Sequence, residues 1–142
     1  MKGHPEIIDC LNQLLCNEIT AGNQFIMHAR MLDNWGIKKL GKLEYDASMD
    51  EMNHADEVMK RILFLEGVPN VQKIGRIQVG LSVKEVLEAD LKCEHINFND
   101  LKVITKIILR VGLYCIVEQI IWSKFLFWHL SILLVVQSYS ER

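Results

Sequence analysis

Residues 50–56 read DEMNHAD, a sequence that places a carboxylate and an imidazole one helical turn apart. Glu51 and His54 are three residues apart, so on a helix both side chains lie on the same face. That face is otherwise apolar, with Ala55 and Val58 following the pair. An ionised side chain in an apolar stripe is costly unless a positive group binds it. The stretch therefore predicts metal ligands inside a helical bundle.

Helical periodicity extends to both sides of this motif. The helix that carries it begins near Lys38 and stops at Gly67. An earlier helix of about thirty residues begins at Pro5, which suits a first helical turn, and is interrupted at residues 34–36. Residues 67–81 show no amphipathic period and contain scattered glycines, so we expect an extended crossover running the length of a bundle.

A third helix completes the set of carboxylates. Ser82 and Glu85 have the spacing of a capping box, in which a hydroxyl and a carboxylate satisfy free backbone amides at a helix start. This helix carries Glu94 on its inner face, and the first helix carries Glu18. Two long helices, a long crossover and a further long helix indicate an all-α, ferritin-like four-helix bundle with a carboxylate cage for two iron ions.

Size and composition limit the number of domains and the classes of function that the chain can have. The chain has 142 residues and a net charge of -2, which predicts one domain over residues 1–142 and no electrostatic basis for binding nucleic acid. The four cysteines show no zinc-binding spacing, and the first residues have no apolar secretory core. A reducing, cytoplasmic setting is the expectation.

Residues 103–142 differ abruptly from residues 1–102. Valine and isoleucine crowd this segment, and part of it has no polar face, so the fourth helix is predicted to be aberrant. Charged residues interrupt the apolar run at Arg110, Glu118 and Lys124, which leaves uncharged stretches shorter than a membrane span. A membrane association is therefore the less favoured interpretation.

Residues 1 to about 101 resemble the bacterioferritins. The resemblance is carried by MKG at 1–3, LLCNE at 14–18, HARM at 28–31, NWG at 34–36, DEMNHAD at 50–56 and RILFLEG at 61–67. That family consists of cytoplasmic iron stores whose four-helix subunits assemble into hollow shells of twenty-four, with haem at two-fold interfaces. Members oxidise Fe(II) to Fe(III) with dioxygen or peroxide at a di-iron centre.

The resemblance implies roles for five residues. Glu18, Glu51, His54 and Glu94 fall where the family has its di-iron ligands, with Glu51 and Glu94 at the positions of bridging carboxylates. Met52 falls where the family has the axial ligand of haem b, which two subunits share across a dimer axis.

The resemblance then ends. The family's second Glu-x-x-His corresponds here to Phe127 and Leu130, with His129 nearby, so half of the second iron's ligands are missing. The sequence after about Ile104 looks like a shifted reading frame or a decayed gene. Phe25 stands where many members have a tyrosine beside the iron.

Several alternatives stay open at this point. Glu-x-x-His also arises by chance on solvated helix surfaces. Met52 could belong to a plain hydrophobic dimer contact with Tyr45, Met49 and Met59, and His28 and His95 are interpreted as structural. The chain could also be a non-catalytic subunit that binds haem and iron and assembles with intact subunits. A further alternative is a degraded product that cannot fold or assemble, or that attaches to membranes through its apolar tail.

Overall fold

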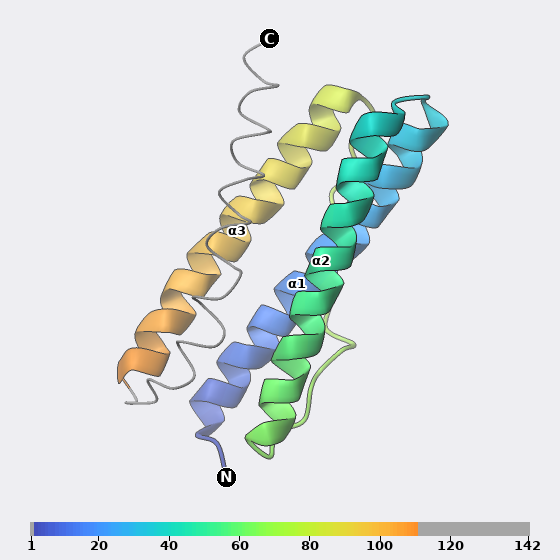
Figure 1. Cartoon of the computed structure of the whole chain (residues 1–142). Helices are drawn as coiled ribbons and strands as arrows, with labels where there is room; N and C mark the ends of the chain where they lie inside the picture. Colours follow the sequence, from blue (N-terminus) through green and yellow to red (C-terminus); the bar gives the residue numbers. More distant parts are fainter. Residues whose placement is uncertain (1, 111–142) are drawn as a thin grey trace.

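The computed structural model describes residues 2–110, which form three long helices. Helix α1 spans Pro5–Asn34, α2 spans Lys38–Phe64 and α3 spans Val83–Arg110. α1 packs against both α2 and α3, and α2 and α3 run in the direction opposite to α1 (Figure 1). The predicted all-α architecture, with two antiparallel helices, a long crossover and a third helix, is confirmed for this part of the chain. The prediction of an aberrant fourth helix, with Phe127, His129 and Leu130, concerns residues outside the described range.

The helix ends form where the local sequence predicts them. Pro5 is the first residue of α1, where its missing N–H costs no helical hydrogen bond. Gly36 has a φ of 83° in the turn between α1 and α2, a conformation that favours glycine. At the start of α3 the Glu85 N–H donates to Ser82 Oγ at 3.3 Å, and Glu85 Oε2 accepts from Leu81 N at 2.9 Å. The capping box is therefore confirmed, with its carboxylate reaching one residue further back than Ser82.

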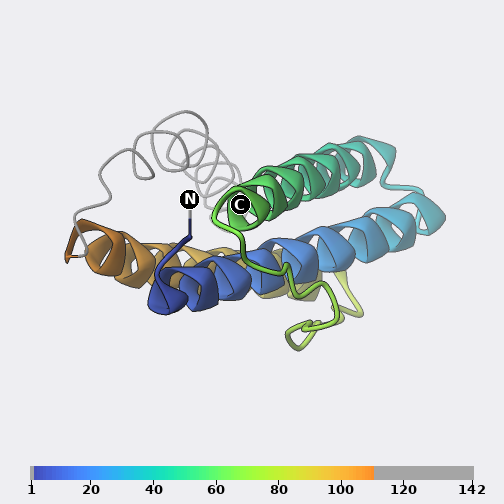
Figure 2. The ribbon, with the colours of Figure 1, turned by 90° about the horizontal axis from the view of Figure 1, so that it is seen from below.

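The segment between α2 and α3 is the expected crossover, and it runs along α1 for most of the length of that helix (Figures 1 and 2). Polar side chains of α1, spaced four residues apart, accept hydrogen bonds from its backbone. These bonds join Gly75 N to Thr20 Oγ1 at 2.8 Å, Gln78 N to Gln24 Oε1 at 2.9 Å and Gly80 N to His28 Nε2 at 3.1 Å. An extended segment without a sheet partner thus finds its acceptors on a helix face.

The interior is layered along the helices. Near the N-terminal end of α1, apolar side chains of all three helices form one cluster, which includes Leu11, Val58 and Leu101. A smaller cluster around Phe25 lies on the other side of the helix middle. Ile104 belongs to the first cluster, so the change in composition at residue 103 falls inside α3 and not at its end.

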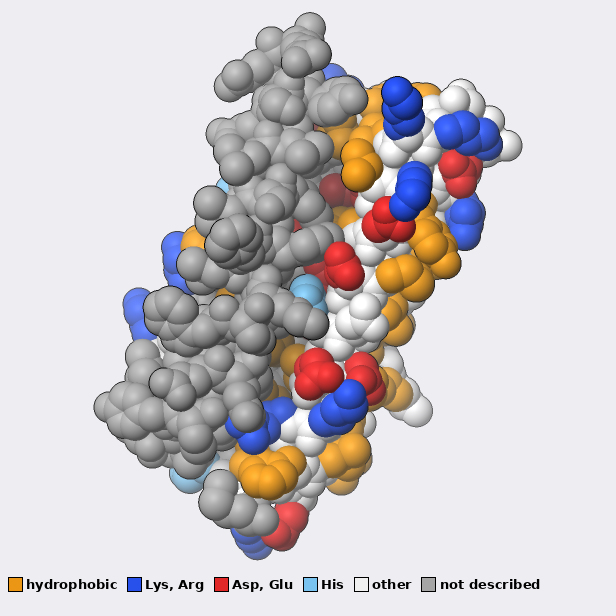
Figure 3. All heavy atoms as spheres, viewed as in Figure 1, with side chains coloured by type: hydrophobic (Ala, Val, Ile, Leu, Met, Phe, Trp, Pro, Cys, Tyr) orange, Lys and Arg blue, Asp and Glu red, His pale blue; other side chains and the backbone are white. Residues whose placement is uncertain are grey.

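The outer surface over α2 carries charged side chains of both signs, interspersed with apolar ones (Figure 3). Several are paired along the helix, as in Lys42 with Asp46 and Lys60 with Glu57. This mixture agrees with the nearly balanced charge of the chain. Among residues 2–110, none of the helices is long and apolar enough to cross a membrane.

Candidate metal centre

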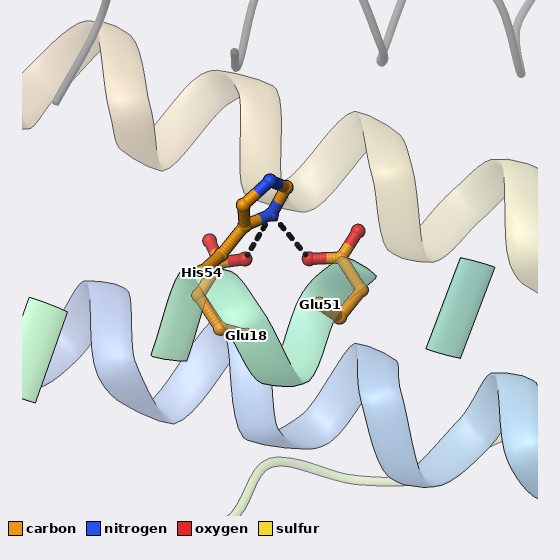
Figure 4. Close-up of side chains that lie close together, drawn as sticks. All are labelled: Glu18, Glu51 and His54. Carbon is orange, nitrogen blue, oxygen red and sulfur yellow. Dashed lines mark hydrogen bonds and ion pairs between the residues drawn. The ribbon is translucent and has the colours of Figure 1, made fainter. Parts of the chain in front are cut away.

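Glu18, Glu51 and His54 come together where α1 and α2 face each other, between the two apolar clusters (Figure 4). One ligand atom from each residue lies within 4.8 Å of the others. His54 Nδ1 is 3.3 Å from Glu51 Oε2 and 3.4 Å from Glu18 Oε2. Two carboxylates and an imidazole that converge in this way can hold a metal ion such as iron.

The local sequence explains why these side chains point inward. Glu51 and His54 lie one turn apart on the face of α2 that also carries Ala55 and Val58. Glu18 lies on the face of α1 that continues Leu14 and Leu15, both of which are buried. The packing of α1 on α2 therefore brings residues that are more than thirty positions apart to one point.

Burial makes the two carboxylates of this cluster costly in their charged form. Glu18 and Glu51 are fully buried, and Glu18 Oε1 and Glu51 Oε1 have no hydrogen-bond partner among the described residues. Burial raises the pKa of Glu18 to about 7, and the charge of Glu94 adds to this increase. Burial also raises the pKa of Glu51 well above its usual range, and the charge of Glu18 raises it further. A bound cation would offset both effects.

Glu94 is buried on α3. Its charge raises the pKa of both Glu18 and Glu51, so it lies near these two carboxyl groups. It is not part of the group whose ligand atoms lie within 4.8 Å of one another. The structure thus brings three of the four predicted ligands together and places the fourth beside them. A bridging role for Glu94 stays a prediction.

A second group of buried polar side chains consists of Gln24, His28 and Asp90. This group was not predicted from the sequence. Asp90 accepts hydrogen bonds from Gln24 Nε2 at 2.8 Å and from His28 Nδ1 at 2.8 Å. Because His28 Nε2 accepts from Gly80 N, the proton of the neutral ring is on Nδ1. The interpretation of His28 as structural agrees with this geometry, since its ring ties the crossover to α3 through α1.

Glu44 is a further buried acidic residue that was not predicted from the sequence. Burial raises its pKa to about 8, and the charges of Asp90 and Glu94 contribute. Its position was available from the sequence, because seven residues separate Glu44 from Glu51 and place both on one helix face. Asp90 precedes Glu94 by four residues and gives the same signal on α3.

Met52 points away from this cluster, as its position next to Glu51 predicts. Its side chain is 42% exposed. The thioether lies against Gly22 of α1, where an added Cβ would come within 3.1 Å of Met52 Sδ. The sulfur therefore lies beside a position of α1 that has no side chain. Haem ligation by Met52 stays a prediction.

Comparison with known proteins gives a consistent result. Residues 8–123 match the ferritin family, described as a ferritin-like domain. The chain is 48% identical over 95 residues to a bacterioferritin of Brucella melitensis biotype 1, which covers 67% of this chain and 59% of the relative. It is 44% identical over 102 residues to a bacterioferritin of Mycobacterium bovis, covering 72% and 64%. A bacterioferritin of Rhodobacter capsulatus is 44% identical over 95 residues, covering 67% and 59%. The matched part of the chain thus spans less than two thirds of each of these relatives.

Proposed function

The chain belongs to the ferritin-like family, and from that premise we propose that it is an iron-storage subunit that oxidises Fe(II) to Fe(III) before the iron is stored. The observation that carries this proposal is the buried cluster of Glu18, Glu51 and His54, in which one ligand atom from each residue lies within 4.8 Å of the others. The relatives named above are bacterioferritins, which supports iron as the metal.

The residues of the cluster bind and position the substrate. Carboxylate and imidazole are suitable ligands for iron, and they stabilise Fe(III) more than Fe(II) because the carboxylates are negatively charged. Two Fe(II) ions each give up one electron. The pair reduces one dioxygen with two protons to hydrogen peroxide, or one hydrogen peroxide with two protons to two waters. Glu94, next to the cluster on α3, is proposed to hold the second ion together with Glu51.

Storage requires assembly, which we propose by the same likeness. Subunits would pair through the outer face of α2 and build the hollow shell that encloses the oxidised iron. Met52 on that face and its symmetry mate are the residues that would hold haem b. The position of Met52 supports this role, because the residue is partly exposed and its sulfur lies beside Gly22, where α1 has no side chain. When bound, the haem would supply an electron-transfer group.

We also propose a cytoplasmic location. Cys10, Cys16 and Cys93 are free thiols, with Cys16 and Cys93 buried, as expected of a protein in a reducing compartment.

A non-catalytic subunit is the second candidate function. It is favoured by the three residues of the compact cluster, which suffice for one metal ion, together with Phe127 and Leu130 where the resemblance predicts ligands for the other. Such a subunit would bind haem and iron and assemble with intact subunits without oxidising iron. A degraded product that does not assemble is the remaining alternative from the sequence.

The test is an anaerobic Fe(II) titration followed by oxygenation, with the ferric absorbance recorded over time. Glu51→Ala should abolish stoichiometric Fe(II) binding, because Glu51 belongs to the cluster and is the predicted bridging ligand. Glu57→Ala, on the exposed side of the same helix, is the matched control and should behave like the parent. If Glu51→Ala and the parent give the same isotherm, the site is wrong. Binding without oxidation would favour the non-catalytic subunit.

A further inference from the structure

Asn97 lies on the face of α3 that is turned into the bundle. Leu101 and Ile104 follow it at four and seven residues, and both belong to the apolar cluster shared with α1 and α2. Glu94 precedes it by three residues and is also buried. These four positions form one stripe, so Asn97 stands between the carboxylate of Glu94 and the apolar core.

The side chain of Asn97 is not satisfied in this position. It is 4% exposed, and its Nδ2 has no hydrogen-bond partner among residues 2–110. Asn17 of α1 is buried to a similar degree, but its Nδ2 donates to Asp100 Oδ2 at 2.8 Å and its Oδ1 accepts from Gln13 Nε2 at 2.9 Å. The bundle can therefore satisfy a buried amide, and Asn97 is an exception. A buried polar group without a partner is destabilising and calls for an explanation.

We propose that Asn97 is a metal ligand that binds through Oδ1 to the ion held by Glu94. The pair Glu94-x-x-Asn97 on α3 repeats the spacing of Glu51-x-x-His54 on α2, which places both members on one helix face. Rotation of the terminal amide exchanges the places of Oδ1 and Nδ2, so the oxygen can take the position that the nitrogen now occupies. This inference rests on the proposed function, since it assigns a ligand to the same iron centre.

The chemistry of an amide suits this site. The carboxylates of Glu18 and Glu51 belong to one buried cluster, and the charge of Glu94 raises the pKa of both. A neutral oxygen ligand adds coordination without adding a fourth negative charge, as the imidazole of His54 does on α2. Oxygen is also a suitable ligand for iron.

The experiment compares the full-length parent with three variants by anaerobic titration with Co(II), which binds carboxylate, amide and imidazole ligands and is followed by its visible absorption. Asn97→Leu keeps the side-chain size and removes both polar atoms. Asn97→Asp keeps an oxygen ligand in the same place. Asn99→Leu removes an exposed amide two residues away on the same helix and is the matched control. Helical content by circular dichroism checks that each variant folds.

The ligand assignment predicts that Asn97→Leu weakens Co(II) binding by at least about tenfold and alters the absorption spectrum. Asn97→Asp should bind Co(II) at least as tightly as the parent, and Asn99→Leu should match the parent. If Asn97→Leu titrates like the parent, the assignment is overturned. It is also overturned if Asp fails to restore the binding that Leu loses, because the amide then acts as a donor.

Failure of this inference is distinguishable from failure of the proposed function. Glu51→Ala is titrated in parallel. If Glu51→Ala loses Co(II) and Asn97→Leu keeps it, the metal centre stands and only the role of Asn97 is rejected. If the parent binds neither Co(II) nor Fe(II), the proposed function is rejected and the ligand assignment with it.

Discussion

Replacing Glu18 with glutamine should flatten the pH dependence of the stability of the metal-free protein. The pKa of Glu18 is about 7 in the folded chain, against an ordinary value of 4.5, chiefly because the side chain is fully buried. A carboxyl whose pKa is raised by folding stabilises the fold while it is protonated. That contribution is complete below pH 4.5 and is lost as the pH rises through 7. The metal-free parent should therefore become less stable between pH 5 and pH 8.

The size of this effect follows from the pKa. At about 1.4 kcal/mol for each unit of pKa, the difference between 4.5 and about 7 amounts to about 3 kcal/mol. Glutamine has nearly the same shape as glutamic acid and does not ionise, so Glu18→Gln should lack this loss. The charge of Glu18 also raises the pKa of Glu51, so removing it relieves the second carboxyl as well.

The assay is urea unfolding of chelator-treated protein at several pH values between 5 and 8. Glu18→Gln should be more stable than the parent at pH 8 by about 3 kcal/mol, with a difference that shrinks toward pH 5. Glu88→Gln, at an exposed position of α3, is the control and should follow the parent. Added Co(II) should stabilise the parent at pH 8 and should stabilise Glu18→Gln less, because the glutamine amide carries no negative charge. Parallel curves for parent and Glu18→Gln would refute the reasoning, because burial would then not hold this carboxyl protonated.

Three further predictions concern haem, catalysis and the crossover. Met52→Leu keeps an apolar side chain and removes the sulfur, so the haem absorption spectrum of the assembled protein should be lost, and an unchanged spectrum would remove Met52 from the site. The double change Phe127→Glu with Leu130→His restores the Glu-x-x-His expected from the resemblance and should raise the initial rate of Fe(II) oxidation; an unchanged rate would show that these positions are not the missing ligands. His28→Ala removes a buried ring that bonds both the crossover and α3, and should lower the free energy of unfolding by about 3 kcal/mol. Asn12→Ala, which removes an exposed contact to the crossover, is the control and should lower the free energy of unfolding by about 1 kcal/mol or less. Equal losses of stability in the two variants would contradict the special role of the buried His28 ring.

The three helices and the ends marked by Pro5, Gly36 and Ser82 could be predicted from the sequence, because helix formation is governed by neighbours along the chain. The continuation of α3 to Arg110 was not predicted. Pro5, Gly36 and the Ser82–Glu85 cap each act within a few residues, and the apolar stripes repeat with the period of one helix. The same local rule identified Glu51 and His54 as one pair on one face. It also indicated that Glu18 and Glu94 face inward, since each lies in an apolar stripe.

The tertiary structure decided which of these inward residues meet. It placed Glu18 against Glu51 and His54 and left Glu94 beside them, a distinction that depends on how each helix is rotated and shifted against its neighbour. The hydrogen bonds from the crossover to Thr20, Gln24 and His28 likewise depend on the tertiary structure, because they join segments more than fifty residues apart.

The unsatisfied amide of Asn97 is the clearest case of a feature that the sequence pattern does not predict. The sequence contains an asparagine three residues after a glutamate, which by itself describes many exposed helix surfaces. Only the tertiary structure shows that this one is buried and that its Nδ2 finds no acceptor within residues 2–110. The periodicity of a helix fixes which side chains share a face, whereas the energy of a buried polar group depends on atoms that other, distant segments bring to it.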